Sequence, residues 1–363
     1  MKRILLVTTD YPPRLGGVAT YYNKLVNQLG SDISVLTSVP GKDKDDIKTF
    51  RKKLFWSFWP HWLPLIWLIP DYLKKTSSKI VWAGQLLPIG TACLINKLLW
   101  QIPYFVSLHG LDIQLVKVSP WKNWLAAQIL KEATFITTNS KFTAGLLSDY
   151  QIPTDKIIVI YPQPQELPKP EQRLIDELKT KYHLINKKVI LTVSRLVKRK
   201  GITEVLEALP MAVKQNSNLV YVIVGDGPEK ANIEARIKEL GLPAILVGAV
   251  SQLELRAWYS ICDIFILVPL DNVIDVEGFG IVYLEAQAAG KPVIGSRVGG
   301  VPEAVGEAGL LVSNQAELLA SLTNLLQNSK ERKRLGEIGF ARVNDQFNIT
   351  TQANKLREVL TSL

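Results

Sequence analysis

Short apolar runs alternate with stretches of helical periodicity along almost the whole chain. Each run is about as long as a buried strand, and amphipathic stretches such as VATYYNKLVNQLG and ITEVLEALPMAVKQ separate several of them. This rhythm is typical of an α/β protein with parallel, doubly wound sheets. The predicted strands lie within RILLVTT, DISVLT, KIVWAG, YFVSLHG, TFITTNS and KIIVIYP, and then within KVILTVSR, LVYVIVGDG, AILVGAV, IFILVP and PVIGS.

One segment breaks this rhythm. PQPQELPKPEQ, Pro162 to Gln172, has four prolines and no apolar periodicity, which is typical of an interdomain linker. A chain of 363 residues also suits two domains better than one. We therefore predict two Rossmann-like domains, residues 1–165 and 166–345. Ligands of such folds collect at the carboxyl ends of the strands, so a cleft between the domains is the expected site.

The composition is that of a globular protein, and no apolar run reaches the roughly 18 residues that a membrane-spanning helix needs. The N-terminal MKRILLVTTDYPP is expected to contain a buried strand and not an export signal, because Asp10 and two prolines end its apolar run. Cys93 and Cys262 lie in separate apolar segments, which predicts buried, reduced thiols in a cytoplasmic protein.

Positive charge is concentrated in the first half of the chain. Residues 1–165 carry 19 Lys and Arg against 10 Asp and Glu, whereas residues 166–363 carry 24 against 23. Within the basic half, the segment Lys48 to Lys75 interleaves basic residues with aromatic ones, a composition that suits the surface of an anionic membrane. The candidates for contact with a membrane or an acceptor are Lys52, Lys53, Trp56, Trp59 and Trp62.

Two other interpretations of this segment stay open. A core-packed helix with a basic rim is disfavoured, because Pro60, Pro64 and Pro70 oppose a long regular helix. Nucleic acid ranks last as a partner, because the sequence has no recognisable nucleic-acid-binding module. The acidic run Asp43 to Asp46 is expected to be a solvated loop and not a metal site.

Glycines and cations follow several predicted strands. In SRLVKRKG, Arg195 ends a strand and Lys200 opens a helix, so two cations beside free helix amides could hold a diphosphate; a solvated basic loop explains the spacing equally well. Gly16 and Gly17 occupy the position where a backbone can closely approach a phosphate, but the spacing is not that of a nicotinamide enzyme. VGDGP, with Asp226, is weak evidence by itself.

The stretch EGFGIVYLE combines two carboxylates with a glycine turn. A helix beginning near Gly280 would direct its amides at the preceding loop, and the absence of side chains at Gly278 and Gly280 would let a ligand approach the backbone. Glu277 before the helix and Glu285 within it suit a ligand rich in hydroxyls. Their apolar setting, which includes Phe279 and Ile281, makes two solvated surface glutamates the weaker interpretation.

These motifs together resemble the retaining GT-B glycosyltransferases of family four, the group 1 glycosyltransferases. EGFGIVYLE resembles the E-x7-E signature, DYPPRLGGVATY the N-terminal glycine loop, SLHGLD the histidine loop and SRLVKRKG the R-x4-K diphosphate site, while VGDGP and GGVPEAV follow in the family's order. The segment DVEGFGIVYLEAQAAGKPVI is most similar in sequence to the phosphatidylinositol mannosyltransferase subgroup. PQPQELPKP departs from the family, which often has Asn-Gly there.

The resemblance implies roles for individual residues. Arg195 and Lys200 would stabilise the departing diphosphate as catalytic cations, Glu277 would hold the sugar hydroxyls, and His109 would contact the sugar near its reacting centre. Glu285 would bind the ribose. The implied donor-binding set is Gly16, Gly17, Asp226, Gly278, Phe279, Gly280, Ile281 and Glu285.

The implied reaction is transfer of a hexosyl group, of the mannose or glucose type, from a GDP- or UDP-sugar to a lipid-linked or glycan acceptor, with retention of configuration. No cofactor and no metal are implied. The first domain would bind the acceptor and the second the donor, and the last helix, about residues 346–363, would cross back to the first domain. The expected location is the cytoplasmic face of the membrane. A sugar-nucleotide epimerase of the same architecture and a non-catalytic membrane-surface protein are the alternatives.

Overall fold

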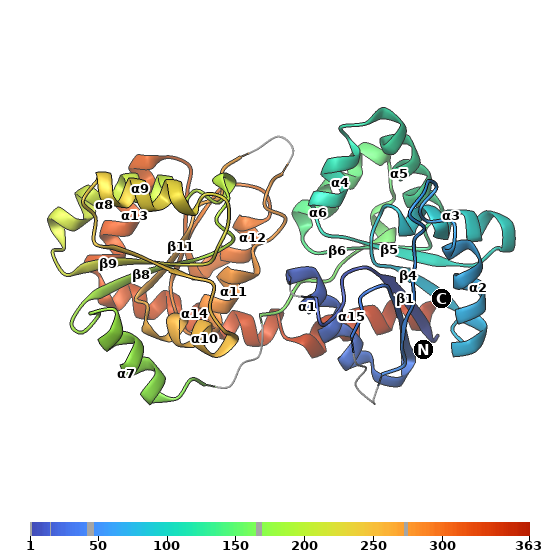
Figure 1. Ribbon diagram of the computed structural model, residues 1–363, viewed down its shortest axis with the longest axis horizontal. Helices are drawn as coiled ribbons and strands as arrows, with labels where there is room; N and C mark the ends of the chain where they lie inside the picture. The colour runs from blue at the N-terminus through green and yellow to red at the C-terminus, as the bar shows by residue number, and fades with distance from the viewer. Residues whose placement is uncertain (1, 15, 42–46, 165–168, 272–274) are drawn as a thin grey trace. The chain divides into compact units, whose positions relative to one another are not determined.

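The computed structural model describes residues 2–14, 16–41, 47–164, 169–271 and 275–363. Its internal contacts divide the chain into two compact units. The first comprises Met1–Gln163 with Phe347–Leu363, and the second comprises Pro164–Gln346. Each unit is built on a parallel sheet with helices on both of its faces (Figure 1).

The sheet of the first unit has seven strands in the order β3-β2-β1-β4-β5-β6-β7. All its pairings are parallel, and Ile4 of β1 lies between Ile33 of β2 and Ile80 of β4. The strands are β1 (Ile4–Thr8), β2 (Ile33–Thr37), β3 (Thr49–Arg51), β4 (Ile80–Ala83), β5 (Tyr104–Leu108), β6 (Ile136–Thr138) and β7 (Ile157–Val159).

Alternating side chains of these strands enter two different cores, because successive residues of a strand point to opposite faces. Leu5 and Val7 pack on one face against α2 (Leu65–Thr76), α3 (Ile89–Trp100) and α5 (Pro120–Glu132). Ile4 and Leu6 pack on the other face against α1 (Gly17–Leu29) and α15 (Ile349–Ser362). The short helices α4 (Leu111–Val116) and α6 (Lys141–Gly145) follow β5 and β6.

The second unit has a six-stranded parallel sheet in the order β10-β9-β8-β11-β12-β13. This is the strand order of a Rossmann fold, and it reverses direction between β8 and β11, as the first sheet does between β1 and β4. The strands are β8 (Lys188–Val193), β9 (Leu219–Val224), β10 (Ala244–Gly248), β11 (Ile264–Leu267), β12 (Val293–Ser296) and β13 (Gly309–Val312).

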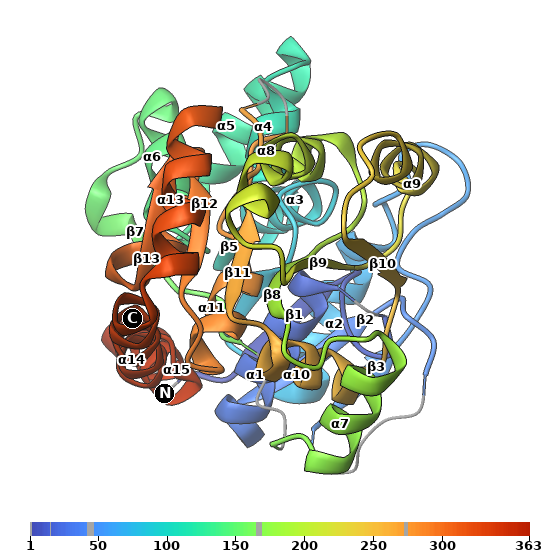
Figure 2. The same ribbon diagram turned by 90° about the vertical axis from the view of Figure 1, so that its left-hand side faces the viewer.

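Helices cover this second sheet as the apolar pattern predicts. One core joins Ile190, Tyr221 and Ile266 of the strands to α8 and α13, and in both views α8 and α9 lie on one side of the sheet while α7 and α10 lie on the other (Figures 1 and 2). The helices are α7 (Gln172–Lys181), α8 (Ile202–Gln215), α9 (Lys230–Glu239), α10 (Gln252–Ile261), α11 (Ile281–Ala288), α12 (Val301–Val305), α13 (Gln315–Gln327) and α14 (Ser329–Gln346).

Each predicted strand is a strand in the structure, and the predicted fold class is confirmed. Two edge strands, β3 and β13, were not predicted; β3 (TFR) lacks an apolar run, whereas β13 (GLLV) has one of the same length as β4 and β12. Cys93 and Cys262 are buried free thiols, as predicted. Among the described residues, no helix is both long and apolar enough to cross a bilayer.

The prediction that prolines exclude a regular core helix within Lys48 to Lys75 is wrong for residues 65–76. These residues form α2, which contains Pro70. Pro70 removes one helical hydrogen bond, but the helix buries Leu65, Ile69 and Tyr72 in the core of the first unit. Burial of such side chains stabilises by about 1.5 to 3 kcal/mol each, which is enough to offset the lost bond.

Candidate active site

In the second unit, most of the predicted site residues lie on two loops at the carboxyl edge of the sheet or on α11, which follows the second loop. Residues 194–201 follow β8 and residues 268–280 follow β11, and the described part of the second loop resumes at Asp275. The two strands are neighbours at the point where the strand order reverses, which is where open α/β sheets bind ligands. The sheet topology therefore brings together residues that are about 80 positions apart, such as Lys200 and Glu277.

Backbone contacts fix these two loops against each other. Leu270 N donates to the Arg199 carbonyl at 2.8 Å. Gly201 has a φ of +67°, and a Cβ there would lie 1.9 Å from the Val268 carbonyl oxygen. Only glycine allows this approach, so the loop that carries the cations lies directly against the end of β11.

Four charged side chains form one cluster on these loops. Lys200 Nζ lies 2.5 Å from Glu277 Oε2, and Arg199 Nη1 lies 2.8 Å from the same oxygen. Arg199 Nε lies 2.7 Å from Asp275, a close ion pair without the alignment of a hydrogen bond. The side chains of Lys200 and Glu277 are each only 13% exposed. The Glu277 carboxylate is therefore paired with two cations, and the cluster is largely shielded from water.

Glu277 is held in its ionised form. Burial raises the pKa of this carboxyl, but the charges and hydrogen bonds of Lys200 and Arg199 outweigh burial, so that the pKa of Glu277 is lowered overall. A carboxylate that stays charged can accept hydrogen bonds from ligand hydroxyls, and a lysine beside it can pair with an anion. The cluster thus offers a carboxylate for the hydroxyls and a cation for the phosphate of a sugar phosphate.

Two further predicted residues of this unit, Arg195 and Asp226, are exposed. Arg195 lies on the same loop as Lys200, and Asp226 follows β9. Asp226 bonds mainly locally: its carboxylate accepts from Gly227 N at 2.8 Å, and its carbonyl accepts from Leu196 N at 2.9 Å. Arg195 is exposed, and among the described residues no hydrogen bond or ion pair joins its side chain to the Lys200 cluster. A Cβ at Gly225 would lie 1.8 Å from the Ser194 carbonyl oxygen, so this glycine serves loop packing.

Beside the glycine turn before α11, a side chain of the protein itself occupies the space next to the backbone. Gly280 precedes the helix with a φ of +92°, and a Cβ there would lie 2.6 Å from the Tyr283 ring. Gly280 is thus needed to pack against Tyr283, and the approach of a ligand to its backbone stays a prediction. Phe279 is buried, so its backbone is the part that could contact a ligand. Gly278 and Ile281 flank these residues and are partly exposed.

Glu285 lies on α11 and is partly exposed. Tyr259 Oη of α10 donates to Glu285 Oε2 at 2.8 Å. This bond orients one carboxylate oxygen and leaves capacity on a group that can accept up to about four hydrogen bonds. Glu285 can thus receive further hydroxyls from a ligand.

In the first unit, His109 directly follows β5 and is neutral. Tyr22 Oη donates to the Gly84 carbonyl at 2.6 Å, so the contact of 2.8 Å between Tyr22 Oη and His109 Nε2 places the proton on Nε2. Burial lowers the pKa of His109 to about 4. Neutral His109 therefore keeps Nδ1 as an acceptor, while Asn139 Nδ2 donates to the His109 carbonyl at 3.0 Å.

Asp112 supports the His109 loop. Its carboxylate accepts from the backbone amides of His109 and Ile113, each at 3.0 Å. Burial raises the pKa of Asp112 to about 6, and these amide bonds partly oppose the rise. The carboxylate thereby ties the residue before the turn, His109, to the first turn of α4.

Gly16 and Gly17 differ from the packed glycines of the second unit. Gly16 precedes α1 with a φ of +149°, and a Cβ at either position would meet no atom of the described residues within 4 Å. The first turn of α1 has no acidic residue. Open space over free helix amides is what the predicted phosphate contact needs.

The candidate membrane residues are not equally exposed. Lys52 and Lys53 are exposed, and Trp59 is 78% exposed. Trp56 stacks on Phe58 with 4.9 Å between ring centroids, whereas Trp62 packs partly against the core of the first unit. The acidic run Asp43 to Asp46 lies outside the described residues.

Sequence reasoning missed four polar groups of these sites: Arg199, Asp275, Tyr22 and Tyr259. Arg199 lies inside a run of three basic residues and Asp275 lies two residues before Glu277, so position along the chain gave a weak signal for both. The two tyrosines had no signal, because their hydroxyls meet His109 and Glu285 only through tertiary packing.

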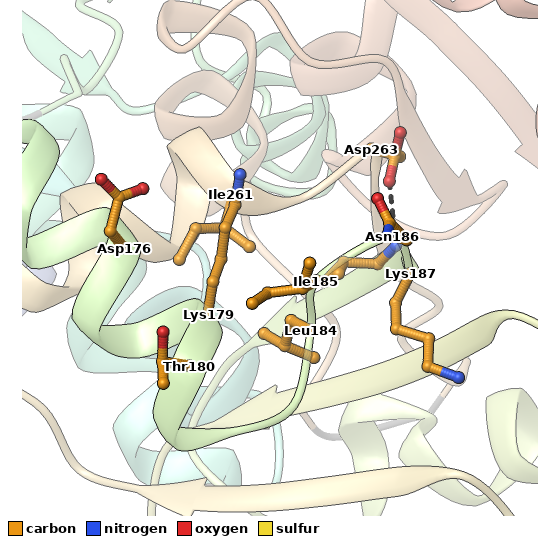
Figure 3. Close-up of a pocket in the computed structure, with 10 residues that line it drawn as sticks. Asp176, Lys179, Thr180, Leu184, Ile185, Asn186, Lys187, Ile261 and Asp263 are labelled. Carbon is orange, nitrogen blue, oxygen red and sulfur yellow. Dashed lines mark hydrogen bonds between the residues drawn. The ribbon is translucent and has the colours of Figure 1, made fainter.

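A separate hollow of about 500 Å³ lies at the opposite edge of the second sheet (Figure 3). Its wall includes Asp263, which precedes β11 and accepts a hydrogen bond from Val189 N at 2.9 Å. Lys188 Nζ pairs with Asp263 at 3.1 Å. The hollow lies at the amino ends of β8 and β11 and contains no predicted site residue.

Two family descriptions match most of the sequence between them. Glycosyltransferase Family 4 matches residues 15–162, and Glycosyl transferases group 1 matches residues 175–342. The boundary between the two matches lies in the proline-rich segment.

Curated proteins are similar over nearly the full length. The chain is 27% identical over 381 residues to a GDP-mannose-dependent alpha-(1-6)-phosphatidylinositol monomannoside mannosyltransferase of Mycobacterium tuberculosis, with 99% of this chain and 98% of that protein covered. It is 24% identical to N-acetyl-alpha-D-glucosaminyl L-malate synthase of Bacillus anthracis, with 92% of this chain and 91% of that protein covered.

Solved structures share the fold. HepE of Anabaena in complex with UDP-glucose superposes with a TM-score of 0.81 at 20% identity, covering 100% of both chains. Sucrose-phosphate synthase of Thermosynechococcus elongatus superposes with a TM-score of 0.78 at 20% identity, covering 100% of this chain and 99% of that chain. With two Rossmann-like units and a match to both family descriptions, the chain belongs to the group 1, family 4 glycosyltransferases and has the GT-B fold.

Proposed function

We propose that this glycosyltransferase moves a hexosyl group from a nucleotide diphosphate sugar to an acceptor hydroxyl, with retention of configuration and without a metal ion. The observation that carries the proposal is the cluster of Lys200, Arg199 and Glu277 at the carboxyl edge of the second sheet. It places a lysine for a phosphate beside a charged carboxylate for sugar hydroxyls.

The donor would be bound by groups on several loops. Lys200 and Arg195 stabilise the diphosphate, while the open backbone at Gly16 and Gly17 adds amide donors. Glu277 accepts from the sugar hydroxyls, and Glu285, oriented by Tyr259, accepts from the ribose. His109 contributes a neutral acceptor near the sugar.

Retention follows if the acceptor attacks on the face from which the diphosphate departs. The bond between the acceptor oxygen and the anomeric carbon forms as the bond from that carbon to the phosphate oxygen breaks. The acceptor proton passes to the departing phosphate oxygen. Negative charge then grows on the diphosphate, and cations that are already in place lower the barrier most where that charge develops.

Donor and acceptor classes are suggested by the relatives. The mycobacterial relative is named as GDP-mannose-dependent and acts on a phosphatidylinositol monomannoside, and HepE is solved with UDP-glucose. We therefore infer a GDP-mannose or UDP-hexose donor and a lipid-linked or glycan acceptor. The exposed Lys52, Lys53 and Trp59 support action at the cytoplasmic face of an anionic membrane.

Calorimetric titration tests the donor site. GDP-mannose and UDP-glucose are each titrated into the wild-type protein, Lys200→Ala and the control Lys198→Ala, which alters an exposed lysine of the same loop. We expect Lys200→Ala to weaken binding of the preferred donor by about tenfold to a hundredfold, since one charge-assisted hydrogen bond contributes about 1.5 to 3 kcal/mol. Lys198→Ala should bind as the wild type does.

Equal binding by Lys200→Ala and the wild type would overturn the assignment of the diphosphate site. Once a donor is identified, proton NMR of the transferred sugar reports whether the anomeric configuration is retained. Turnover in excess EDTA reports whether a metal is needed, and loss of turnover there would refute that part of the proposal.

A further inference from the structure

The first unit contains a cavity of about 940 Å³ that is separate from the Lys200 cluster and whose lining includes Trp59 and Trp62, two of the candidate membrane or acceptor residues. Its lining comes from three segments: residues 59–62, α3 with the turn that precedes it, and the helices α4 and α5. This volume is at the upper end of the range of about 300 to 1,000 Å³ that small-molecule sites occupy. The cavity is therefore large enough for an organic ligand.

Apolar and aromatic side chains dominate the lining. The lining includes four tryptophans: Trp59 and Trp62 before α2, and Trp121 and Trp124 of α5. Trp121 and Trp124 are 59% and 65% exposed. Large indoles that stay exposed around an apolar hollow mark a surface that a ligand or partner covers.

The exposed apolar residues of the first unit extend around this cavity. Those near its walls include Phe58, Leu111, Leu115 and Val118. In the described part of the second unit, the exposed large apolar side chains are scattered along the chain: Ile185, Met211, Leu253 and Phe340. Exposed large apolar side chains are therefore more numerous in the first unit, and several of them belong to the segments that line the cavity.

A few polar groups of the lining point to an amphiphile. Thr91 is 5% exposed, and its Oγ1 has no hydrogen-bond partner among the described residues. A buried hydroxyl without a partner costs about 1 to 3 kcal/mol, so a ligand oxygen at this position would be favourable. Lys122 supplies a cation at the same cavity.

The cavity also reaches the loop that holds His109. Asp112 lines the cavity and at the same time caps the backbone amide of His109. A molecule with its apolar part between the indoles would therefore have its polar end close to this loop. The two features are connected through one residue and lie in the same unit.

We propose that this cavity binds one hydrocarbon chain of a lipid acceptor that carries a phosphate, with the polar head directed to the Asp112 loop. The inference rests on the proposed function and names the acceptor class for it. Lys122 and the basic balance of residues 1–165 complement an anionic head group. Residues of three separate segments line this mostly apolar cavity, which fits a single chain, whereas shallow insertion into a membrane would need only one apolar face.

Photolabelling with hexadecyl phosphate that carries a terminal diazirine tests the proposal. Mass spectrometry of the full-length protein then maps the labelled peptides. We expect label on residues 59–62, 87–95 and 111–125. The double variant Trp121→Ser, Trp124→Ser should lose about tenfold in labelling there, because removal of anchoring aromatics typically costs more than about 1 kcal/mol.

The matched control is Trp67→Ser, Trp100→Ser, which alters two exposed tryptophans of α2 and α3 outside the cavity lining. The control should label as the wild type does. Equal loss in both double variants would indicate flat contact with an amphiphile surface and would overturn the proposal. Label spread evenly over the first unit, or an unchanged pattern in the cavity variant, would overturn it too.

Donor titration in the same variants separates this inference from the proposed function. Labelling of the cavity without binding of any nucleotide sugar would refute the donor site and leave the chain-binding site standing. Donor binding without labelling of the cavity peptides would support the donor site and refute the chain-binding site. Thr91→Val, which keeps the side-chain shape and removes the hydroxyl, should lower labelling by a smaller factor than the tryptophan variant does.

Discussion

At the scale of single residues, one carboxylate oxygen organises the proposed donor site. Glu277 Oε2 accepts from both Lys200 and Arg199, and Asp275 holds Arg199 from its other side. When Lys200 pairs with a diphosphate, Arg199 can keep Glu277 neutralised. Arg199 is therefore a positioning residue, because a buried carboxylate that loses all its cations would be strongly destabilised.

Replacing Arg199 tests this role. We expect Arg199→Ala to weaken donor binding by about tenfold or more, because a buried charge left short of a partner costs several kcal/mol before relaxation. Asp275→Asn should act in the same direction with a smaller effect. Titration calorimetry measures both, with Lys198→Ala as the control, and unchanged affinity in Arg199→Ala would contradict the role.

At the scale of elements, the glycines of the loops have two different structural roles. Gly201 lets the β8 loop touch the end of β11, whereas Gly17 begins α1 beside open space. The same residue type, in the same position after a strand, thus serves packing in one unit and leaves backbone accessible in the other. Only the neighbours of each glycine distinguish the two.

Alanine substitution should distinguish these two roles by its effect on stability. Gly201→Ala requires a left-handed φ and a shift of the Val268 carbonyl, so it should lower the free energy of unfolding by about 2 kcal/mol or more. Gly17→Ala should leave it equal or raise it by about 0.5 kcal/mol, since alanine favours a helix. Urea denaturation measures both, and similar losses in the two variants would contradict the assignment.

At the scale of the whole molecule, the last helix belongs to the first unit. The chain leaves the second unit after α14 and ends in α15, which buries Ala353, Leu356 and Leu360 against α1 and the first sheet. Gln352 of the same helix accepts from the backbone amide of Tyr161 at 3.0 Å. The core of the first unit is thus completed only when the final residues of the chain are in place.

A substitution near the C-terminus should consequently loosen the N-terminal core. Leu356→Ala is expected to cost about 2 to 5 kcal/mol through the lost burial and the cavity it leaves. Hydrogen exchange should show faster exchange in α1 and β1, while Leu322→Ala in α13 should speed exchange in α8. Loss of protection in α13 and α14 after Leu356→Ala would contradict this division of the cores.

The strand and helix pattern determined much of this molecule by itself. The alternation of apolar runs with helical stretches predicted the doubly wound fold, because a buried parallel strand must be apolar on both faces. Position after a strand also made Glu277 and the N-terminal glycines candidates, since the carboxyl ends of parallel strands share one edge. For Lys200 it left a solvated loop equally open, and His109 was indicated only by the resemblance to the family.

Tertiary structure alone decided which of these residues meet and what surrounds them. The pairing of Arg199 with Asp275 and Glu277 depends on β8 and β11 being neighbours, which residue spacing does not encode. The protonated nitrogen of His109 depends on Tyr22, and the role of Gly280 depends on the Tyr283 ring. The apolar cavity likewise joins segments that are up to about 65 residues apart. Such contacts follow from packing in three dimensions, because burial and charge are properties of a neighbourhood and not of a position in the chain.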